Sequence, residues 1–347
     1  MRTLPETDST RTFETNAPPA PPAPDLQSPK RSRRWLAGLG AGALIAGALL
    51  TDRGGWLVVP LLFVLVVPFE KFFPRHRQPI RRPGLGTDIA YGLASPVLRV
   101  VSVVVGLTVG IASLAWIPGL LLRPFVLALP GTVRLILGVL LLDLLTYWLH
   151  RFSHEVPLLW RFHAIHHSTN RLDWVSGLRN HPFDGALLAP PFVFMAVAGF
   201  PLQFVGLLAL LQVLLGLFLH ANVRWQWRPL QKIVITPEFH HWHHTNELSA
   251  QHTNYSVFLP VWDLVFGTFS IPGDRRPEKY GIDEFMPKGI INQLRHPFRG
   301  LPPTRRVLTA GLRHPLRCLR FLLRNIRSIL AQMMKSARRP TRSSIHS

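Results

Sequence analysis

The chain of 347 residues is 48% apolar with a mean hydropathy of +0.20, yet it carries a formal net charge of +21. Apolar blocks separated by arginine-rich segments explain this combination, which is typical of a membrane protein and disfavours both a soluble globule and a nucleic-acid-binding protein. The single cysteine, Cys318, excludes an internal disulfide and offers no thiolate cluster for zinc or an iron–sulfur centre.

The N-terminal part divides into a polar tail and a pair of apolar runs. Residues 1–29 include the run APPAPPAP and cannot bury a core, which predicts a disordered tail. A basic stretch at 30–34 precedes the apolar runs Trp35–Leu50 and Trp56–Phe69. A signal peptide, even a twin-arginine one, is one interpretation of this pattern. We favour a membrane hairpin over residues 30–84, because the second apolar run follows the first almost at once.

Four further apolar segments follow, and we place them at about 88–117, 132–149, 185–199 and 201–219. Together with the N-terminal hairpin they predict an all-α, polytopic bundle with about four to six transmembrane helices. The basic blocks at 31–34 and 71–82 lie on one side of the membrane if the first two runs form a hairpin. By the positive-inside rule that side is cytoplasmic, and the later segments return the chain to it. The composition favours a bacterial plasma membrane.

Eleven of the sixteen histidines lie between His150 and His244, and most of them fall into three clusters. Residues three and four apart lie on one face of a helix, so each cluster can present its imidazoles from one side. Imidazole is a ligand for iron, zinc, copper and nickel, and eight imidazoles exceed what one metal uses. We therefore predict a cytoplasmic, histidine-rich cap that holds two metal ions. The clustered candidate ligands are His150, His154, His163, His166, His167, His240, His243 and His244.

Three more histidines lie near these clusters. His220 ends the last apolar segment and is the better additional ligand candidate. For His181, which begins the apolar pair, a ligand and a scaffold role are both open. His241 lies about 100° around a helix from His240, which predicts an outward position or a hydrogen bond to a ligand. Isolated histidines are usually ordinary core or surface residues, and we assign no role to His76, His296, His314 and His346.

Ligating histidines normally donate their second ring N–H to a carboxylate or carbonyl. Asp143 lies seven residues before His150, two helical turns away on the same face. A carboxylate inside an apolar segment is costly unless it serves a function, so we predict that Asp143 supports a ligand. A hydrogen bond between helices is the alternative. Weaker candidates for the same supporting role are Glu155, Asp184 and Glu238.

The chain beyond residue 223 is polar enough for a cytoplasmic cap, and Pro237 is suited to the first turn of the helix that carries the third cluster. Residues 271–347 form a basic tail in which 315–339 alternates arginine with large apolar residues at helical spacing. This pattern favours a basic amphipathic helix on the membrane surface over an interface for a partner protein.

The HxxxH, HxxHH and HxxHH series between apolar segments resembles the fatty acid hydroxylase / sterol desaturase superfamily of integral-membrane di-iron enzymes. The likeness covers roughly residues 85–270 and extends to the flanks of the clusters. Ser256 departs from the pattern, which often has glycine after Asn-Tyr. The flanking elements that carry the resemblance are Asp143 with Tyr147–Arg151, Arg179–Pro182, His220–Asn222, Asn254–Tyr255 and Trp262–Thr268.

This resemblance implies two iron ions (Fe2+/Fe3+) held by histidines. It also implies O2-dependent hydroxylation or desaturation of a fatty acyl, sterol or related lipid. No dinucleotide fingerprint or CxxC set is visible, so the electrons would come from a separate reductase, ferredoxin or cytochrome. One alternative is a membrane zinc hydrolase, but His154-Glu155 is not followed by the second histidine of HExxH. A non-catalytic metal-binding membrane protein is another, and a haem protein would leave most of the histidines unexplained.

Overall fold

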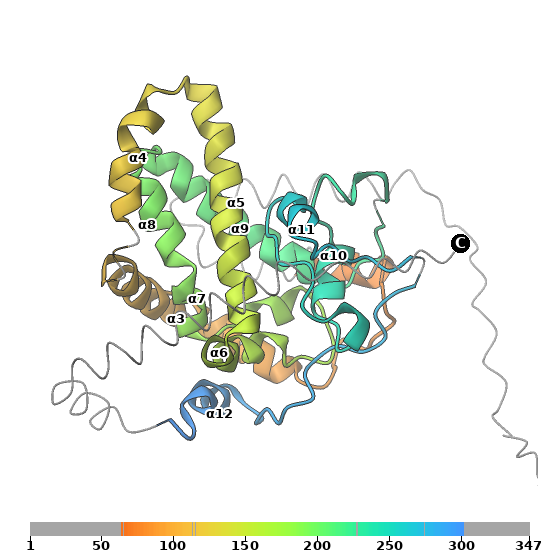
Figure 1. Cartoon of the computed structure of the whole chain (residues 1–347). Coiled ribbons are helices and arrows are strands. Elements are labelled where there is room, and N and C mark those ends of the chain that lie inside the picture. Colours follow the sequence, from red (N-terminus) through yellow and green to blue (C-terminus); the bar gives the residue numbers. More distant parts are fainter. Residues whose placement is uncertain are drawn as a thin grey trace, which may run out of the picture.

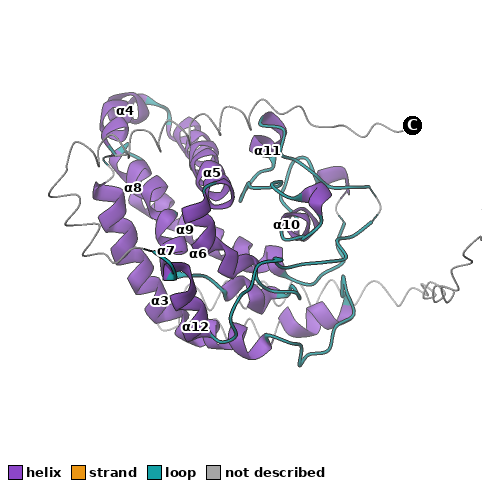
Figure 2. Cartoon of the chain, turned by 60° about the horizontal axis from the view of Figure 1, so that its bottom comes forward, coloured by secondary structure: helices purple, strands orange, loops and turns teal. Residues whose placement is uncertain are grey.

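The computed structural model describes residues 64, 66–112, 114, 116–226, 228–273 and 275–301. The expected tail at 1–29, most of the expected hairpin at 30–84 and the expected amphipathic helix at 315–339 lie outside these residues. The described part is helical, as predicted, and contains no strand, only isolated bridges between Pro74 and Val223 and between Thr245 and Tyr280 (Figure 2).

Three described helices are long and apolar enough to cross a membrane: α3 (Leu85–Ala112), α5 (Gly131–Glu155) and α9 (Leu202–His220). They correspond to three of the four segments expected in this region. The remaining one, expected at 185–199, is divided into α7 (Pro182–Leu187) and α8 (Ala189–Val197) and is shorter than a full span. These apolar helices and the largely exposed faces of their spans indicate an integral membrane protein.

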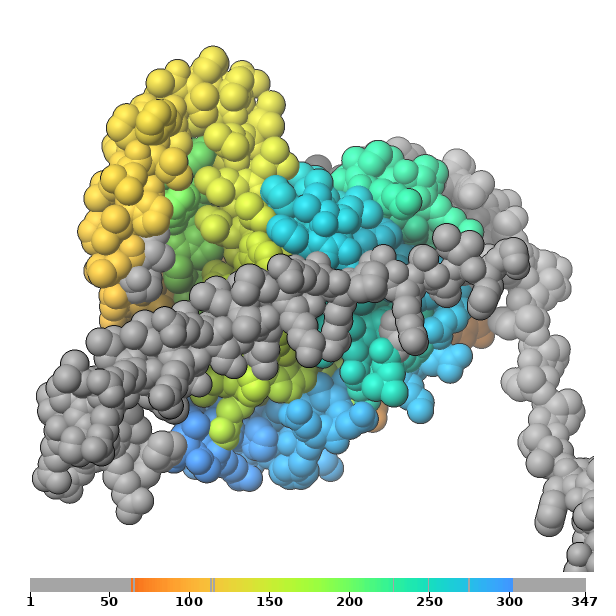
Figure 3. All heavy atoms as spheres, in the orientation of Figure 1, coloured from red at the N-terminus to blue at the C-terminus, as the bar shows by residue number. Residues whose placement is uncertain are grey.

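One helix was not expected from the sequence. The third apolar segment does not continue to about residue 117, because α3 ends at Ala112 and Leu114 adopts a left-handed backbone conformation (φ 56°). Such a conformation interrupts a right-handed helix. A separate helix, α4 (Ile117–Ala128), then begins with a proline in its first turn. Helix α4 and the first part of α5 stand out at the upper left of the molecule and pack on α8, and α5 then runs down to α6 (Figure 1 and Figure 3).

The apolar core lies between α5, α8 and α9, where Leu142, Met195 and Phe200 are almost fully buried. Helix α3 packs against α7 and α8 (Figure 1). The approach is so close that a side chain at Gly106 would place its Cβ 2.5 Å from the Cβ of Ala189. This packing fixes the segment around α7, which borders the histidine clusters.

Short helices joined by loops form a cap at the ends of α5 and α9. Thr236 caps α10 by accepting the N–H of Phe239, and Pro237 stands in its first turn as expected. The cap consists of α6 (Pro157–His167), η1 (Trp174–Leu178), η2 (Arg228–Leu230), α10 (Pro237–His243), η3 (Leu248–Ala250), α11 (Val261–Val265), α12 (Ile290–Arg295) and η4 (His296–Phe298).

Candidate metal centre

Nine histidines converge in two groups where α5, α6, α9 and α10 meet. Within each group the candidate ligand nitrogens all lie within 4.8 Å of one another. Seven of these histidines are buried, and His150 and His154 are half-buried. The five-histidine group is His150, His154, His163, His167 and His243, and the four-histidine group is His166, His220, His240 and His244.

The two HxxHH clusters are interleaved between the groups. On α6, His163 and His167 belong to the five-histidine group, whereas His166 points into the other. On α10 the assignment is reversed, so that His243 joins the five-histidine group. The groups adjoin, because the rings of His167 and His244 stack with centroids 4.1 Å apart. The arrangement is therefore one centre with two adjacent binding positions.

Hydrogen bonds to the outer ring nitrogens leave the inner nitrogens available as ligand atoms. His166 Nδ1 donates to Arg179 O (3.1 Å) and His220 Nδ1 donates to Gly216 O (2.6 Å). The Nε2 atoms of these two neutral rings must then carry lone pairs, yet they face each other at 3.1 Å. Two acceptors at this distance repel each other unless a cation lies between them. The residues therefore fit a bound metal ion.

Two further ring nitrogens of the five-histidine group are buried and lack any hydrogen-bond partner among the described residues: His154 Nε2 and His243 Nε2. A buried polar nitrogen without a partner is destabilising, and metal coordination would satisfy it. The chemistry of the donors is uniform, since all nine are imidazoles. Imidazole suits iron, zinc, copper and nickel, and it does not suit magnesium or calcium.

Backbone carbonyls also orient two ligands of the five-histidine group. His150 Nδ1 donates to Tyr255 O (2.7 Å), and His243 Nδ1 donates to Thr253 O (2.8 Å). Both carbonyls belong to the loop after η3, where Asn254 has a left-handed conformation (φ 61°) and its amide donates to Phe239 O. This loop therefore sets the ring orientation of two ligands that come from different helices.

Of the four carboxylates considered as supports, Asp184 contacts a ligand. Its two oxygens lie 3.1 and 3.0 Å from His163 Nδ1. His181 is not in either group. Its Nδ1 accepts the N–H of Phe183 at the start of α7, and its Nε2 lies 3.2 Å from Leu294 O. It thus occupies a scaffold position at the beginning of the helix that carries Asp184.

The expected partnership between Asp143 and His150 is wrong. The Asp143 carboxylate accepts the backbone N–H groups of Val257 (3.2 Å), Phe258 (2.9 Å) and Leu259 (3.0 Å). It is fully buried and holds the chain just beyond Tyr255, whose carbonyl accepts from His150. Asp143 therefore supports His150 only indirectly, by holding this loop in place. The three N–H donors allow its carboxylate to be buried in the apolar core.

Three other expected positions differ in detail. Glu155 pairs with Arg151 (2.8 Å), and Glu238 accepts the side-chain amides of Gln226 and Gln231. His241 does lie off the face shared by its neighbours, but it is fully buried and not outward. Its nitrogens lie 3.1 Å from Ala221 O and 2.9 Å from the Tyr280 hydroxyl, so it bonds no ligand side chain.

A buried ion network behind His166 was not foreseen from the sequence. Arg179, whose carbonyl accepts from His166, directs its guanidinium to Asp88 (Nε–Oδ1 2.6 Å). Asp88 also pairs with Arg82 (2.7 Å), and Arg82 forms two bonds to Asp173. Because each charge is paired with an opposite charge, this network can be buried. It holds Arg179, whose carbonyl accepts from His166, against Asp88 of α3. The segments are about 90 residues apart along the chain, so local spacing carries no signal of it.

Acid should destabilise the metal-free protein. Burial, followed by the proximity of other imidazoles, lowers the pKa of His167, His240 and His244 well below the ordinary value of 6.5. The unfolded chain then binds more protons below about pH 6.5, so stability is complete above that pH and falls as the pH decreases. We expect a constant thermal unfolding midpoint of the metal-free protein in detergent above about pH 7 and a steady decrease toward about pH 5. A midpoint that rises on acidification would contradict this.

Sequence comparisons agree with this geometry. Residues 135–268 match the fatty acid hydroxylase family. The ornithine lipid hydroxylase of Rhizobium tropici is 35% identical over 170 residues, which cover 49% of this chain and 51% of that protein. The alkylglycerol monooxygenase of Danio rerio is 32% identical and that of Homo sapiens 30%, over 40% and 37% of this chain and 31% and 29% of those proteins.

The chain thus spans about half the length of the first of these relatives and less of the others. No solved structure matches it at a significant level. The matched region contains all nine convergent histidines, together with the loop and the aspartates that support them. The predicted resemblance to the fatty acid hydroxylase family is therefore confirmed over residues 135–268.

Proposed function

We propose that this protein is an integral-membrane di-iron oxygenase that oxidises a C–H bond of a lipid. The observation that carries the proposal is the pair of adjacent groups in which nine imidazoles converge at the ends of apolar helices. Iron is the metal we assign, because it accepts imidazole ligands and because the chain matches the fatty acid hydroxylase family. Bound iron would supply O2 activation for attack on an unactivated C–H bond.

The chain itself would orient the ligands and exclude water. Carbonyls and Asp184 hold the outer ring nitrogens of His150, His163 and His166, which would leave their inner nitrogens pointing inward as ligand atoms. The ligand set is mostly buried, which keeps bulk water from the reacting carbon. The apolar exposed faces of α5 and α9 would let a lipid chain stay in the membrane while one carbon reaches the centre.

Hydroxylation is the reaction we favour over desaturation. The relatives are named a hydroxylase of ornithine lipid and monooxygenases of alkylglycerol, and each of these substrates joins a polar headgroup to an apolar chain. We infer a membrane lipid of this kind as the substrate and a separate protein as the electron donor. Residues 85–270 would form the catalytic domain, with the centre on the cytoplasmic side of a bacterial plasma membrane.

A zinc hydrolase is disfavoured by one contact. Its general base would have to be Glu155, which follows His154, but this carboxylate is held by Arg151 at 2.8 Å. Among the described residues, both histidine groups consist of imidazoles alone and offer no carboxylate to replace it.

Metal analysis and lipid analysis test the proposal together. The protein purified in detergent should contain two iron ions per chain. Lipid extracts from cells with and without the gene should differ by a species that has gained one oxygen atom, or lost two hydrogen atoms if the reaction is desaturation. One zinc ion per chain with no oxidised lipid would support a hydrolase instead.

A further inference from the structure

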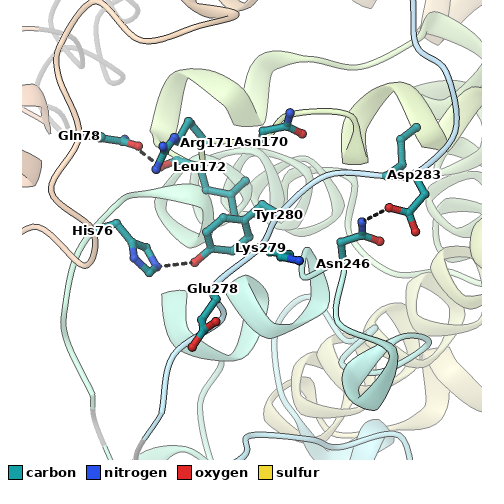
Figure 4. A pocket seen from close by; sticks show the side chains of 11 residues that line it. His76, Gln78, Asn170, Arg171, Leu172, Asn246, Glu278, Lys279, Tyr280 and Asp283 are labelled. Atoms are coloured by element: carbon teal, nitrogen blue, oxygen red, sulfur yellow. Dashed lines mark hydrogen bonds between the residues drawn. The ribbon is translucent and has the colours of Figure 1, made fainter. Parts of the chain in front are cut away.

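Residues 279–299, which lie beyond the family-matched region, cross the outside of the metal centre, and we call this segment the strap. It includes α12 and η4, and it begins beside α10. Asn246 lies two residues after the proposed ligand His244. Its backbone N–H donates to Lys279 O (3.0 Å), and its side-chain amide donates to Asp283 (2.6 Å; Figure 4). One end of the strap is therefore fixed to the chain that leaves α10.

The rest of the strap contacts three consecutive residues of α6, which directly precede the proposed ligand His163. Consecutive residues are about 100° apart around a helix, so the three contacts span about 200° of its circumference. Contacts spread this widely resist rotation of α6 about its axis, and such a rotation would turn His163 out of its group. The contacts are hydrogen bonds from Trp160 Nε1 to Glu284 Oε1 (3.2 Å) and from the Arg161 guanidinium to Arg299 O, and a ring contact between Phe162 and Phe298 (centroids 5.5 Å apart).

The strap also contacts the segment that carries the carboxylate partner of His163. Leu294 O lies 3.2 Å from His181 Nε2 at the start of α7, and Asp184 follows on that helix. The Phe298 ring contacts the His181 ring as well, with centroids 5.8 Å apart. One short segment therefore holds both the ligand and the carboxylate that contacts it.

Trp160 lies beside the five-histidine group, and the strap fixes its position. Its ring centroid lies 5.3 Å from that of His154, 5.6 Å from that of His167 and 6.3 Å from that of His163. His154 is half-buried, so this side of the group is closer to solvent than the buried ligands are. The hydrogen bond to Glu284 keeps the indole on this side.

We propose that the strap is a positioning element for the five-histidine metal position: it joins the two HxxHH helices from outside and holds His163, Asp184 and Trp160 around the metal. The inference rests on the metal centre of the proposed function. It adds that residues outside the family-matched region determine how firmly one of the two metals is retained. Loss of a residue that orients a metal ligand commonly weakens metal binding about 10- to 100-fold, and the strap acts on a ligand and on its partner at once.

Release of cobalt(II) from the full-length protein in detergent tests the strap without any oxidation chemistry. Cobalt(II) accepts imidazole ligands, and its visible absorption changes as it leaves them. In excess EDTA, Phe298→Ala should release cobalt about tenfold faster than the parent, because α6 and α7 lose a shared contact. Phe298→Tyr keeps the ring and should release cobalt at the parental rate. Phe285→Ala is the matched control, since its exposed ring contacts His296, a residue of the strap itself.

A second pair of variants tests the contact with Trp160. Glu284→Ala removes the acceptor of the indole N–H and should speed cobalt release several-fold. Glu284→Gln retains an acceptor oxygen at this place and should restore the parental rate. This pair decides the question if Phe298→Ala does not accumulate in the membrane.

Hydrogen exchange distinguishes positioning from general destabilisation. In metal-free Phe298→Ala, exchange should be faster in α6 and α7, the helices that Phe298 contacts, and parental in α9. Faster exchange throughout the chain would show a purely structural role and would overturn the inference.

Two further results would also overturn it: parental cobalt release in both Phe298→Ala and Glu284→Ala, or equal acceleration in Phe285→Ala. A parent protein that binds neither cobalt nor iron would refute the proposed function, and this inference with it. Two firmly bound metals with parental release in the strap variants would refute the inference alone.

Discussion

Alanine in place of His166 or His243 is expected to abolish lipid oxidation while the protein still accumulates in the membrane. Each substitution removes one ligand, and the two ligands belong to different groups. Insertion depends on the apolar helices, which neither change touches. His243→Ala should weaken metal binding in the five-histidine group, and His166→Ala in the four-histidine group. Turnover should fall to background in both, because the reaction would need both metals.

Iron content per chain and oxidised lipid should be measured on the same detergent-purified samples. His296→Ala is the matched control, since this histidine lies outside both groups, and it should keep parental iron and turnover. Near-normal turnover in either ligand variant would refute the proposed ligand set. A variant that fails to accumulate in the membrane would show that the histidine is needed for folding. The thermal unfolding midpoints of the metal-free parent and variant would measure this loss of stability directly.

Asparagine at position 143 should lower turnover about ten- to a hundredfold while most of the iron is retained. The carboxylate accepts three backbone N–H groups from residues 257–259. An asparagine keeps one acceptor oxygen and turns an NH2 group toward a backbone N–H, which costs about 1.5–3 kcal/mol for each bond lost to a charged acceptor. The loop would loosen, and the Tyr255 carbonyl would hold His150 less firmly.

Hydrogen exchange resolved to the 255–259 segment distinguishes this mechanism from general destabilisation. Thr146→Val is the matched control, because its buried hydroxyl bonds only carbonyls of α5. We expect faster exchange in the loop for Asp143→Asn and parental exchange there for the control. Unchanged loop exchange and unchanged turnover in Asp143→Asn would show that the contact between α5 and the loop does not support the centre.

Local periodicity identified the histidines that converge, but it could not show how they are shared. The spacing of three and four residues places imidazoles on one face of a helix, and eight of the nine histidines of the two groups were candidates for this reason. His220 was a candidate because it ends the last apolar segment. The same reasoning treats each HxxHH cluster as one unit. In the structure His166 and His243 cross to the opposite group, which depends on how α6 and α10 face each other.

Contacts between distant segments explain what the sequence could not predict. The partner of Asp143 lies 114 to 116 residues away, and that of Arg179 lies at Asp88, 91 residues away. No periodic pattern links such positions. The extra helix α4 depends on a left-handed residue, Leu114, that sequence alone does not mark as a turn. The apolar spans were placed more accurately, because their length is a property of the local sequence.

The interleaving of the two groups has a consequence for how the protein acquires its metal. Filling the five-histidine group orders α5, α6 and the end of α10, which together carry eight of the nine histidines. Only His220, from α9, would then remain to complete the second position. Uptake should therefore be strongly cooperative, with the second ion captured more tightly than the first. Under limiting metal, a cell would contain fully loaded and empty chains in place of a half-loaded population.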